Sequence, residues 1–538
     1  MTLVENLTAL RDLAITTDIV YVKGYNNSGD GGGGYFIWKT DEPFKTGIYS
    51  IENYGTIIKS TVVSSNQGSW VRQYENYINV LFFGALGIGN DYTTAFQRAI
   101  DFANLNSLYN PSLKGSTVFI PNGSYVLTNI ILKNGISILG ESMSNTYIYS
   151  PNGTSSQYLF EIEAGPITIN ISNLCLIGNN TPKGCFLFKS QASSVAPFHG
   201  GLWNSRFSNI NISGFNGNAI YLHGGEKGSN YLLPNQFNIF ENISVSKNSD
   251  YTYGLYMTGQ NAQCTFINCR FDGFKRNYTY SKGQNVRITS TVISFINCTF
   301  QDADYGIYIE GGRNITIDNC WFENLGVAIT IISKTDTASN EVPSRGVNIL
   351  NNYFANAAGF GSLNAPNNIK SGQCISIDKS FVSIYNNTVN VSDPNGEYYN
   401  NNSSFIYGSN NIIGGINVGN NVFNYAKLGK TYGIMKIVNI VNNTIDCSNN
   451  KIIFVNGSNS PITKIISSIN AGELINIRAN TSSITLKNTY NIFFMTNNAN
   501  QSLTLENGEN ATFIKVDNHL SSDIYETYQL ISVIKKLS

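Results

Sequence analysis

The sequence predicts an all-β protein whose main part is a parallel β-helix, in which the chain winds through successive coils of short strands. Two observations predict this fold. A six-residue pattern centred on asparagine recurs along the middle of the chain, and the residues after each asparagine alternate between apolar and polar. Because β-strand side chains point to opposite faces in turn, this alternation indicates strands with one buried face.

The recurring pattern is apolar–x–Asn–x–x–apolar, with its asparagine at variable intervals. The differences between successive asparagines range from 22 to 36 residues. A leucine-rich repeat or a propeller would keep a tighter period, whereas a β-solenoid with a minimum coil near 22 residues tolerates loops inserted in some coils. The pattern asparagines are Asn173, Asn209, Asn242, Asn268, Asn297, Asn319, Asn351, Asn386, Asn420 and Asn442.

Asparagine at this position suits a sharp bend between two strands, because it tolerates the left-handed backbone region. When asparagines stack on successive coils, their amides can also hydrogen-bond along the helix axis. We therefore interpret these residues as structural rather than functional.

The positions after the bend predict the core. Counting the bend asparagine as zero, positions +1 and +3 are expected to point inward, and +2 and +4 outward. Position +1 holds cysteines and position +3 holds phenylalanines in the same coils; these residues are Cys269, Cys298 and Cys320, and Phe271, Phe300, Phe322 and Phe354. None of the eight cysteines has the spacing of a zinc site, so we expect reduced core thiols and neither metal nor cofactor.

Residues 78–106 predict the start of the solenoid. A strand and a glycine-rich turn precede an amphipathic helix near 92–105, with Ala95, Phe96, Ala99, Ile100 and Ala103 on one side. This order resembles the entry to the pectate-lyase-like β-helix superfamily, where such a helix caps the open end. The following segment, TVFIPNGSYVLTNIILKNGISILGES, resembles that family's first coils.

The segments before residue 78 resemble the small domain that precedes the β-helix in phage tailspikes. They are VYVKGYNNSGDGGGGYFIW at 20–38 and GSW at 68–70. The resemblance implies a right-handed parallel β-helix that acts as a homotrimeric depolymerase of bacterial capsular or O-antigen polysaccharide, carried on the phage tail or baseplate as part of the virion. The expected domains are a head or neck domain at 1–77, the β-helix at 78–450 and a β-rich, trimerising domain at 451–538.

The composition limits the classes of partner that the protein is expected to bind. The 34 basic and 34 acidic residues cancel, whereas nucleic-acid-binding proteins usually carry a basic excess. Residues 1–14 do not read as a signal peptide, and no run of 18 apolar residues occurs. We therefore expect neither nucleic-acid binding nor membrane insertion, as for a virion component released by lysis that acts at the host surface.

A second alignment predicts outward columns on the strand before the bend. It places YLHG (221–224), YMTG (256–259), YSKG (280–283) and YIEG (308–311) in one register. One outward column then holds Tyr221, Tyr256, Tyr280 and Tyr308, and the adjacent one holds His223, Thr258, Lys282 and Glu310. After the bend, the +2 column holds Arg270, Thr299, Trp321 and Tyr353, and the +4 column Asp272, Gln301 and Glu323.

These columns predict a glycosidase site. Asp272 and Glu323 are two coils apart, which places their backbones about 9.6 Å apart, compatible with the carboxyl spacing of inverting glycosidases. Asp302 and Asp304, in an expected loop between columns, could bring a carboxylate nearer Glu310. The predicted catalytic pool is Glu310, Glu323, Asp272, Asp302 and Asp304; the predicted substrate contacts are Trp321, Tyr308, Tyr256, Arg270, Arg313, Lys282 and His223.

Two other functions stay open. A polysaccharide lyase needs a base and a group that neutralises a uronate, which Lys282, Arg270, Arg313 and His223 could supply. A spike or adhesin would bind glycan without cutting it, because function lies in sites rather than in folds.

Overall fold

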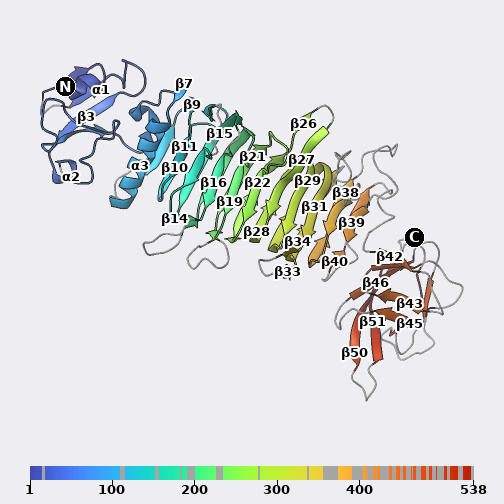
Figure 1. The fold of residues 1–538 in the computed structure, drawn as a ribbon. Helices are drawn as coiled ribbons and strands as arrows, with labels where there is room; N and C mark the ends of the chain where they lie inside the picture. The colour runs from blue at the N-terminus through green and yellow to red at the C-terminus, as the bar shows by residue number, and fades with distance from the viewer. Residues whose placement is uncertain are drawn as a thin grey trace.

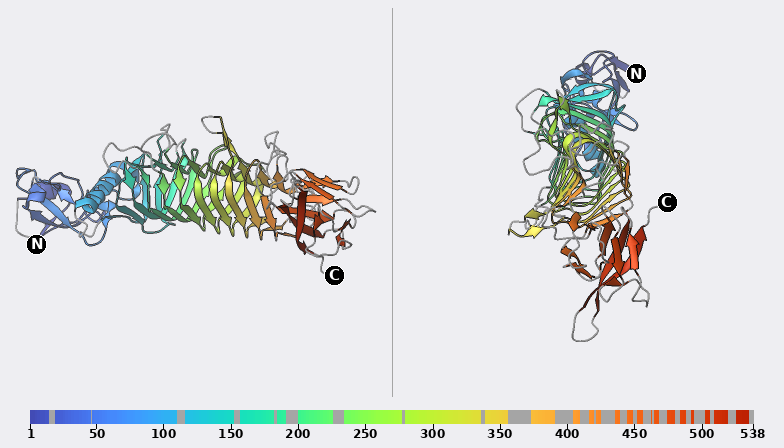
Figure 2. Two further views of the ribbon diagram at one scale, coloured as in Figure 1. Left: turned by 90° about the horizontal axis from the view of Figure 1, so that it is seen from below. Right: turned by 90° about the vertical axis from the view of Figure 1, so that its right-hand side faces the viewer.

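A computed structural model of the 538-residue chain describes most of its first 355 residues, residues 373–390, and beyond these the strands β39–β51 with a few residues between them. The segments before 356 that are not described are 15–18, 46, 110–115, 152–156, 182–183, 191–199, 226–233, 277–278 and 336–338. The fold is elongated, with a small sheet at the N-terminal end, a long stack of coils, and further strands at the C-terminal end (Figures 1 and 2).

The N-terminal part is a five-stranded sheet in the order β1-β2-β3-β5-β4. Its strands are β1 (Thr2–Val4), β2 (Val20–Val22), β3 (Gly34–Lys39), β4 (Ile57–Ile58) and β5 (Ser69–Gln73), with short helices α1 (Leu7–Arg11) and α2 (Glu42–Lys45). The buried Arg72 guanidinium donates hydrogen bonds to the carbonyl oxygens of Gly32, Gly33 and Gly55. A Cβ at Gly33 would lie 2.5 Å from the carbonyl oxygen of Val22, which explains part of the glycine run.

The coils contain three columns of parallel strands, named A, B and C in the order in which the chain visits them. Column A runs through β6 (Ile78–Asn79), β8 (Thr117–Ile120), β11 (Ile136–Gly140), the first parts of β15 (Ile169–Thr181), β18 (Arg206–Phe215) and β21 (Ile239–Ser246), then β24 (Cys264–Ile267), β28 (Thr291–Ile296), β30 (Arg313–Asp318), β34 (Arg345–Leu350), β37 (Val382–Tyr385) and β40 (Ile416–Gly419).

Columns B and C complete each coil. Column B runs through β7 (Ile88–Asp91), β9 (Gly123–Val126), β12 (Thr146–Tyr149), the second parts of β15, β18 and β21, β25 (Arg270–Asp272), the first parts of β29 (Thr299–Glu310) and β31 (Trp321–Ile332), β35 (Tyr353–Ala355), β38 (Thr388–Asn390) and β41 (Val422–Asn424). Column C runs through β10 (Ile130–Leu132), β13 (Phe160–Ile162), β16 (Phe186–Lys189), β19 (Ile220–His223), β22 (Leu255–Thr258), the end of β27 (Thr279–Ile288), the second parts of β29 and β31, β36 (Gln373–Ile377) and β39 (Ser404–Gly408).

The bend between columns A and B is made by the predicted asparagines. All eight from Asn173 to Asn386 have a positive φ, between 52° and 60°. Their side-chain amides link neighbouring coils; for example, Asn242 donates to Asn209 at 2.7 Å and Asn297 to Asn268 at 2.6 Å. The left-handed bend is confirmed for all eight residues. The amide ladder is confirmed from Asn173 to Asn242 and from Asn268 to Asn319, whereas the Asn351 amide donates to Oδ1 of Asp318. Asn420 and Asn442 lie outside the described residues.

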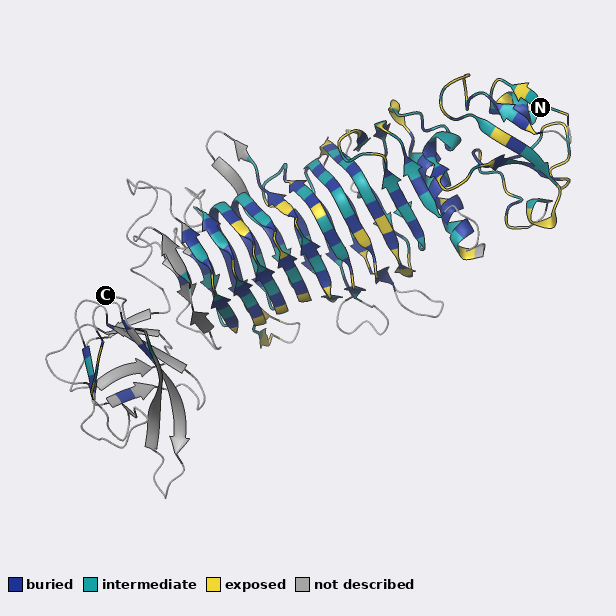
Figure 3. Cartoon of the chain, turned by 180° about the vertical axis from the view of Figure 1, so that it is seen from behind, coloured by how far each residue is buried: buried dark blue, intermediate teal, exposed yellow. Residues whose placement is uncertain are grey.

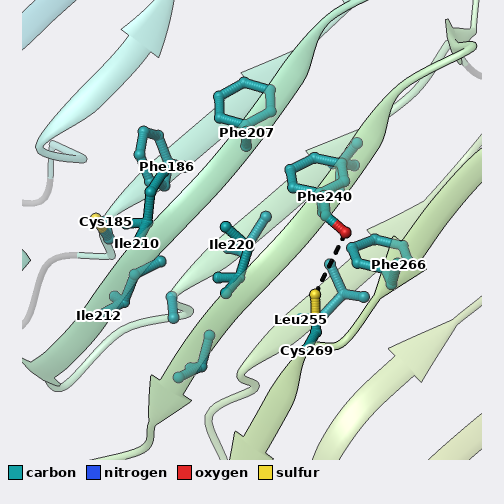
Figure 4. Close-up of a cluster of buried hydrophobic side chains, with 14 of the residues drawn as sticks. Cys185, Phe186, Phe207, Ile210, Ile212, Ile220, Phe240, Leu255, Phe266 and Cys269 are labelled. Atoms are coloured by element: carbon teal, nitrogen blue, oxygen red, sulfur yellow. Dashed lines mark hydrogen bonds between the residues drawn. The ribbon is translucent and has the colours of Figure 1, made fainter. Parts of the chain in front are cut away.

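The core is confirmed as predicted. Cys269, Cys298 and Cys320 are buried, and seven cysteines in the described side chains are free thiols; Cys447 is not among them. Two ladders of stacked phenylalanine rings run inside the helix. They are Phe207–Phe240–Phe266–Phe295, at 4.8 to 5.0 Å between ring centroids, and Phe271–Phe300–Phe322–Phe354, at 4.9 to 5.7 Å. Figure 4 shows part of the first ladder and the contact of the Cys269 thiol with the Phe240 carbonyl oxygen. Figure 3 shows the alternation of buried and partly exposed residues along the strands.

The open end of the stack is covered by α3 (Thr93–Tyr109), which confirms the predicted capping helix. Its apolar side, including Phe96, Ala99 and Ile100, is buried against the first coils. Asp91 begins the helix by accepting hydrogen bonds from the Thr93 amide and hydroxyl at 2.9 and 2.6 Å. A short 3-10 turn, η1 (Val80–Phe83), precedes it.

Short pairs of strands lie at the corners of the coils. They are β14 (Pro166–Ile167) with β17 (Gly201–Leu202), β20 (Asn235–Gln236) with β23 (Asn261–Ala262), β26 (Lys275–Arg276) with β27, and β32 (Lys334–Thr335) with β33 (Glu341–Val342). The hairpin of β26 and β27 projects outward from the stack (Figure 1).

Further strands follow column B's last strand, β41. They are β42 (Met435–Val438), β43 (Thr444–Ser448), β44 (Ile452–Val455), β45 (Lys464–Ser467), β46 (Leu474–Ala479), β47 (Ile484–Lys487), β48 (Ile492–Phe493), β49 (Ser502–Leu505), β50 (Asn510–Asn518) and β51 (Tyr525–Ile534). Six of them form a sheet in the order β42-β44-β46-β50-β51-β48. The predicted fold class, an all-β parallel β-helix with a capping helix and β-rich ends, is confirmed; the domain boundaries at 77 and 450 stay a prediction.

The bend asparagines make a first prediction. At the φ of 54° of Asn297, alanine costs about 1–2 kcal/mol of backbone strain that glycine avoids, and both substitutions remove the ladder amide. We expect Asn297→Ala to lower the thermal midpoint more than Asn297→Gly. The matched control is Asn348→Ala on column A, which removes only a weak 3.4 Å contact to Gly346. Equal midpoints for the alanine and glycine variants would contradict this account of the bend.

Candidate functional site

The corners of the coils differ in how much chain they carry. From Asn173 onward the A–B corner is a tight bend at one left-handed asparagine, whereas the other two corners carry insertions on several coils. The longer insertions at the B–C corner include 150–159, 247–254 and 273–285, and those at the C–A corner include 190–205, 224–238 and 333–344. Because loops on a rigid scaffold concentrate binding and catalytic residues, column C and the B–C corner are the favoured places for a site.

The outward side chains of column C form a surface that we name the C face. It consists of Tyr221, His223, Tyr256, Thr258, Arg287, Tyr308 and Glu310, together with Tyr158 and Tyr253 from the B–C corner. In this register Tyr256 pairs with Arg287, and Arg287 pairs with Tyr308.

Tyrosine rings stack along the C face. The centroids of Tyr221 and Tyr256 are 4.8 Å apart, and those of Tyr253 and Tyr256 are 4.6 Å apart. The Tyr221 hydroxyl lies 3.2 Å from Nδ1 of His223, and both lie within 3.1 Å of the Thr258 hydroxyl. Burial raises the pKa of Tyr256, so its hydroxyl is a hydrogen-bond donor at neutral pH.

An ion pair occupies the middle of the C face. Nη2 of Arg287 lies 2.7 Å from Oε2 of Glu310, and Nη1 donates to the Tyr253 hydroxyl at 3.1 Å. The guanidinium also lies 5.6 Å from the centroid of the Tyr308 ring. Glu310, Tyr308, Tyr256 and His223 from the predicted set are therefore together on this face.

The predicted register was wrong for one coil. The YSKG segment belongs to the β26–β27 hairpin, so Arg287 and Thr289, rather than Tyr280 and Lys282, continue the two columns. The other three YxxG segments lie in column C, one strand earlier than the strand predicted before the asparagine bend. The repeated tyrosine–glycine spacing concealed the strand Val286–Ile288, so Arg287 was missed; the apolar–x–apolar pattern of NVRI was the available signal.

Four other predicted carboxylates lie along the B–C corner, which we name the acidic corner: Asp272, Asp302, Asp304 and Glu323. Asp272 pairs with Gln301, and Gln301 pairs with Glu323, which confirms that Asp272 and Glu323 are two coils apart in one column. Glu310 is separate from this group. Asp304 and Glu310 belong to the same extended strand, β29, six residues or about 20 Å apart, so the predicted loop that would bring them together does not exist.

Asp272 has the most perturbed environment of the four. It was expected to face solvent, but the residue is only 7% exposed. Its Oδ2 lies 2.6 Å from Nε of Arg270, and its buried Oδ1 has no hydrogen-bond partner among the described residues. Burial raises the pKa of Asp272 to about 6, against the lowering effect of Arg270 and with a further contribution from the Asp302 charge. This is the direction that a general acid needs.

Asp302 and Asp304 have structural partners. Asp302 makes the B–C bend with a φ of 59°, and its Oδ1 accepts a hydrogen bond from the Asn324 amide at 3.1 Å. Asp304 is buried, and its Oδ2 accepts the Gly283 amide at 3.2 Å. Burial raises the pKa of Asp304, while the Gly283 amide and the charge of Lys247 lower it.

Glu323 lies beside an aromatic stack on column B. Its Oε2 accepts a hydrogen bond from Nε1 of Trp321 at 3.1 Å, and the Trp321 and Tyr353 ring centroids are 4.5 Å apart. Trp321 is 40% exposed. Trp321 and Arg270 thus flank the carboxylates of the acidic corner, as their shared +2 column predicts.

Two predicted contacts lie elsewhere. Arg313 begins β30 in column A, where it pairs with Arg345. Lys282 lies at the base of the β26–β27 hairpin, and its amide donates to Oδ1 of Asp250 at 2.8 Å. Lys247, which no pattern in the sequence singles out, is 6% exposed at the base of this hairpin.

Within the described residues, no group of three or more His, Cys, Asp or Glu side chains is arranged to hold a metal ion. Among the same residues, no helix has the length and apolarity needed to cross a membrane.

Two family models match the chain. Residues 3–75 match the phage tail protein small four-stranded beta-sheet domain, and residues 77–184 match rhamnogalacturonase A/epimerase, pectate lyase-like. No curated protein sequence matches the chain.

Solved structures with a similar fold include phage proteins and a sugar epimerase. Tailspike protein 2 of an Escherichia coli O157:H7 bacteriophage has 16% identity and a TM-score of 0.41, over 85% of this chain and 51% of that one, so this chain spans about half its length. The tailspike gp49 of Acinetobacter baumannii bacteriophage Fri1, a capsular polysaccharide depolymerase, has 13% identity and a TM-score of 0.41, over 99% and 92% of the two chains. The A-module of an Azotobacter vinelandii mannuronan C-5 epimerase has 17% identity and a TM-score of 0.40, over 65% and 98%.

The strand pairing of this chain establishes the parallel β-helix, and the two family matches cover its first 184 residues almost completely. The resemblance predicted from the sequence is thereby confirmed for the matched segments: residues 3–75 match a phage-tail β-sheet domain, and residues 77–184, which begin the parallel β-helix, match a pectate-lyase-like family.

Proposed function

We propose that this protein is an endoglycosidase that hydrolyses a bacterial capsular or O-antigen polysaccharide at the acidic corner. The observation that carries the proposal is Asp272, a shielded carboxyl whose pKa is raised to about 6, in one column with the partly exposed Glu323. Glycoside hydrolysis needs such a pair, one carboxyl that is protonated and one that is ionised.

In the proposed step, Asp272 gives its proton to the glycosidic oxygen as the bond from the anomeric carbon to that oxygen breaks. Glu323 removes a proton from the water whose oxygen attacks the same carbon. Two coils separate the backbones of these residues by about 9.6 Å, near the upper end of the 6.5–9.5 Å between carboxyls in inverting enzymes. Inversion of the anomeric carbon is therefore the expected outcome.

Asp302 supports the acid in this proposal. Its charge is one of the contributions that raise the pKa of Asp272, because a neighbouring negative charge disfavours ionisation. The Asn324 amide fixes the Asp302 carboxylate at the bend. We assign Asp302 to tuning the acid and Asp304 to holding the hairpin, rather than to proton transfer.

The proposed glycan contacts are of two kinds. Sugar rings have apolar C–H faces and hydroxyl rims, so the Trp321–Tyr353 stack beside Glu323 suits a ring next to the cleaved bond. The hydroxyls of Tyr256 and Tyr308, with His223 and the Arg287–Glu310 pair, suit further hydroxyl groups along the C face.

A second candidate is β-elimination on the C face. The described part of this face presents a guanidinium, an imidazole and several tyrosine hydroxyls but a single carboxylate, Glu310. Elimination from a uronate uses a base at C5 and a cation near the carboxylate. In that case Glu310→Gln and Tyr308→Phe would abolish cleavage while Glu323→Gln would not, and the products would absorb in the ultraviolet.

We also propose that the chain assembles as a homotrimer on a phage tail or baseplate and acts at the host surface as part of the virion. The phage-tail match of residues 3–75 supports this placement. Sedimentation is expected to give about three times the chain mass of 59.1 kDa; a mass near the single-chain value would contradict the trimer.

Substitutions in the acidic corner test the catalytic assignment. We expect Asp272→Asn and Glu323→Gln each to lower kcat at least 100-fold, because general acid and base groups contribute about 10²–10⁴-fold each. Their effect on binding should be small. The measurement is the rate of reducing-end formation from the polysaccharide of a strain that the protein binds.

The matched control is Glu241→Gln, which removes a surface carboxylate paired with Arg206 on column A. It should cut at the normal rate. Full activity in both acidic-corner variants would refute the assignment, and loss of activity in the control would show that any such change disturbs the fold. A protein that binds glycan and never shortens it would support the adhesin.

The raised pKa of Asp272 makes a prediction that does not need catalysis. The pKa of Asp272 is about 6 in the folded protein and ordinarily 3.8, so the folded state binds this proton more tightly than the unfolded chain does. Protonation of Asp272 therefore stabilises the fold fully below about pH 4, and this stabilisation is lost as the pH rises through 6. Asparagine stays neutral throughout. The stability of Asp272→Asn relative to the wild type should therefore increase between pH 4 and pH 8, by up to about 3 kcal/mol, in denaturant unfolding. A pH-independent difference would show that Asp272 titrates normally.

A further inference from the structure

The projecting hairpin of β26 and β27 leaves the coil directly after Asp272 and returns at Asn285 (Figure 1). Its exit and return are joined by the buried Asn285, whose amide donates to the carbonyl oxygens of Phe271 and Gln301 at 2.9 and 2.8 Å. The Gly273 amide also donates to the Gln301 carbonyl oxygen at 2.8 Å. The base of the hairpin is therefore fixed beside the carboxyl of the proposed acid.

A buried cation fastens the returning strand. Nζ of Lys247 donates to the Gln284 carbonyl oxygen at 3.2 Å, and its backbone amide donates to the carbonyl oxygen of Asp272 at 2.9 Å. One residue thus contacts both the segment that carries the acid and the segment that returns from the hairpin. Burial lowers the pKa of Lys247 to about 8, while the charges of Asp304 and Asp250 act in the opposite direction.

Two carboxylates complete the fastening. Asp304 accepts the Gly283 amide, and Asp250 accepts the Lys282 amide at 2.8 Å. The Tyr251 amide in turn donates to the Lys282 carbonyl oxygen at 3.1 Å. Consecutive backbone groups from 282 to 284 are therefore held by side chains of two neighbouring coils. Ordinary surface loops are more mobile and are not held in this way.

We propose that Lys247 and Asp304 are positioning residues, which fasten the base of the hairpin beside Asp272 and so keep its carboxyl shielded and poised as the acid. The inference rests on the proposed function for its catalytic consequence. The fastening itself concerns only the shielding of Asp272.

The charged groups around this cluster determine the direction in which the pKa of Asp272 is expected to change when the fastening is lost. Among the described side chains, Arg270 and Asp302 act on Asp272, and Asp304 and Asp250 act on Lys247. Lys247 and Asp304 do not act on Asp272 through charge but through the hairpin. Loss of the fastening should admit water to Asp272 and return its pKa toward the ordinary value, because desolvation is the largest cause of the shift.

The test uses Lys247→Met and Asp304→Ala in the full chain, which remove the contacts to the Gln284 carbonyl oxygen and the Gly283 amide. The alkaline limb of the kcat/KM profile should move to lower pH by about one unit or more in both variants. We also expect Asp272→Asn, combined with either variant, to give a smaller increase in relative stability between pH 4 and pH 8 than it gives in the wild type. Lys133→Met is the matched control, since it removes a lysine paired with Glu163 on column C and should change neither readout.

The outcomes separate the fastening from the proposed function. One outcome is that the pH-dependent effect of Asp272→Asn on stability shrinks in the two variants, while Asp272→Asn alone cleaves at the wild-type rate. In that case the fastening stands and the catalytic assignment fails. If both folded variants leave both readouts unchanged, the fastening is overturned. Should both variants fail to fold, Asp250→Ala, which removes the contact to the Lys282 amide and the carboxylate charge that acts on Lys247, carries the same test with the same two readouts.

Discussion

The coil-to-coil register of the β-helix depends on one constraint, the left-handed asparagine bend between columns A and B. Each bend turns the chain sharply with a single residue, so the strands of successive coils start at the same level and pair in parallel. The amide ladder then ties the bends along the axis. Because side chains alternate across each strand, a one-residue slip would exchange the buried phenylalanine ladders for outward residues, so the bend also determines which residues face solvent.

That register brings distant residues together at the B–C corner. Asp272, Asp302 and Glu323 come from three successive coils and meet because their strands are held at the same level. From Asn173 onward the A–B bend is tight and carries no insertion, whereas the B–C corner carries several. Asp272 is buried at this corner, and its desolvation raises the pKa of the carboxyl. In our proposal the fastened base of the hairpin maintains that burial. In our account, the scaffold sets the spacing of the carboxyls and the insertion sets the proton affinity of one of them.

Features that repeat in every coil could be predicted from the sequence, and features of a single insertion could not. The bend asparagines, the Cys and Phe core positions and the capping helix follow from alternation and repeated spacing, and the structure has them as predicted. The alignment failed at residues 280–283, where a hairpin contains a tyrosine–glycine spacing like that of column C, and it therefore missed Arg287. Lys247 and Asn285 join separate segments of the chain at the base of this hairpin, so no local pattern encodes the burial of Asp272 and Lys247.

The most direct test of hydrolysis at the acidic corner is mass spectrometry of the oligosaccharides released from a susceptible host polysaccharide, with NMR of the first anomer formed. The account predicts regular fragments heavier than the repeating units by one water, with an inverted anomeric carbon. Fragments that lack this water and carry an unsaturated sugar would contradict it and assign elimination instead.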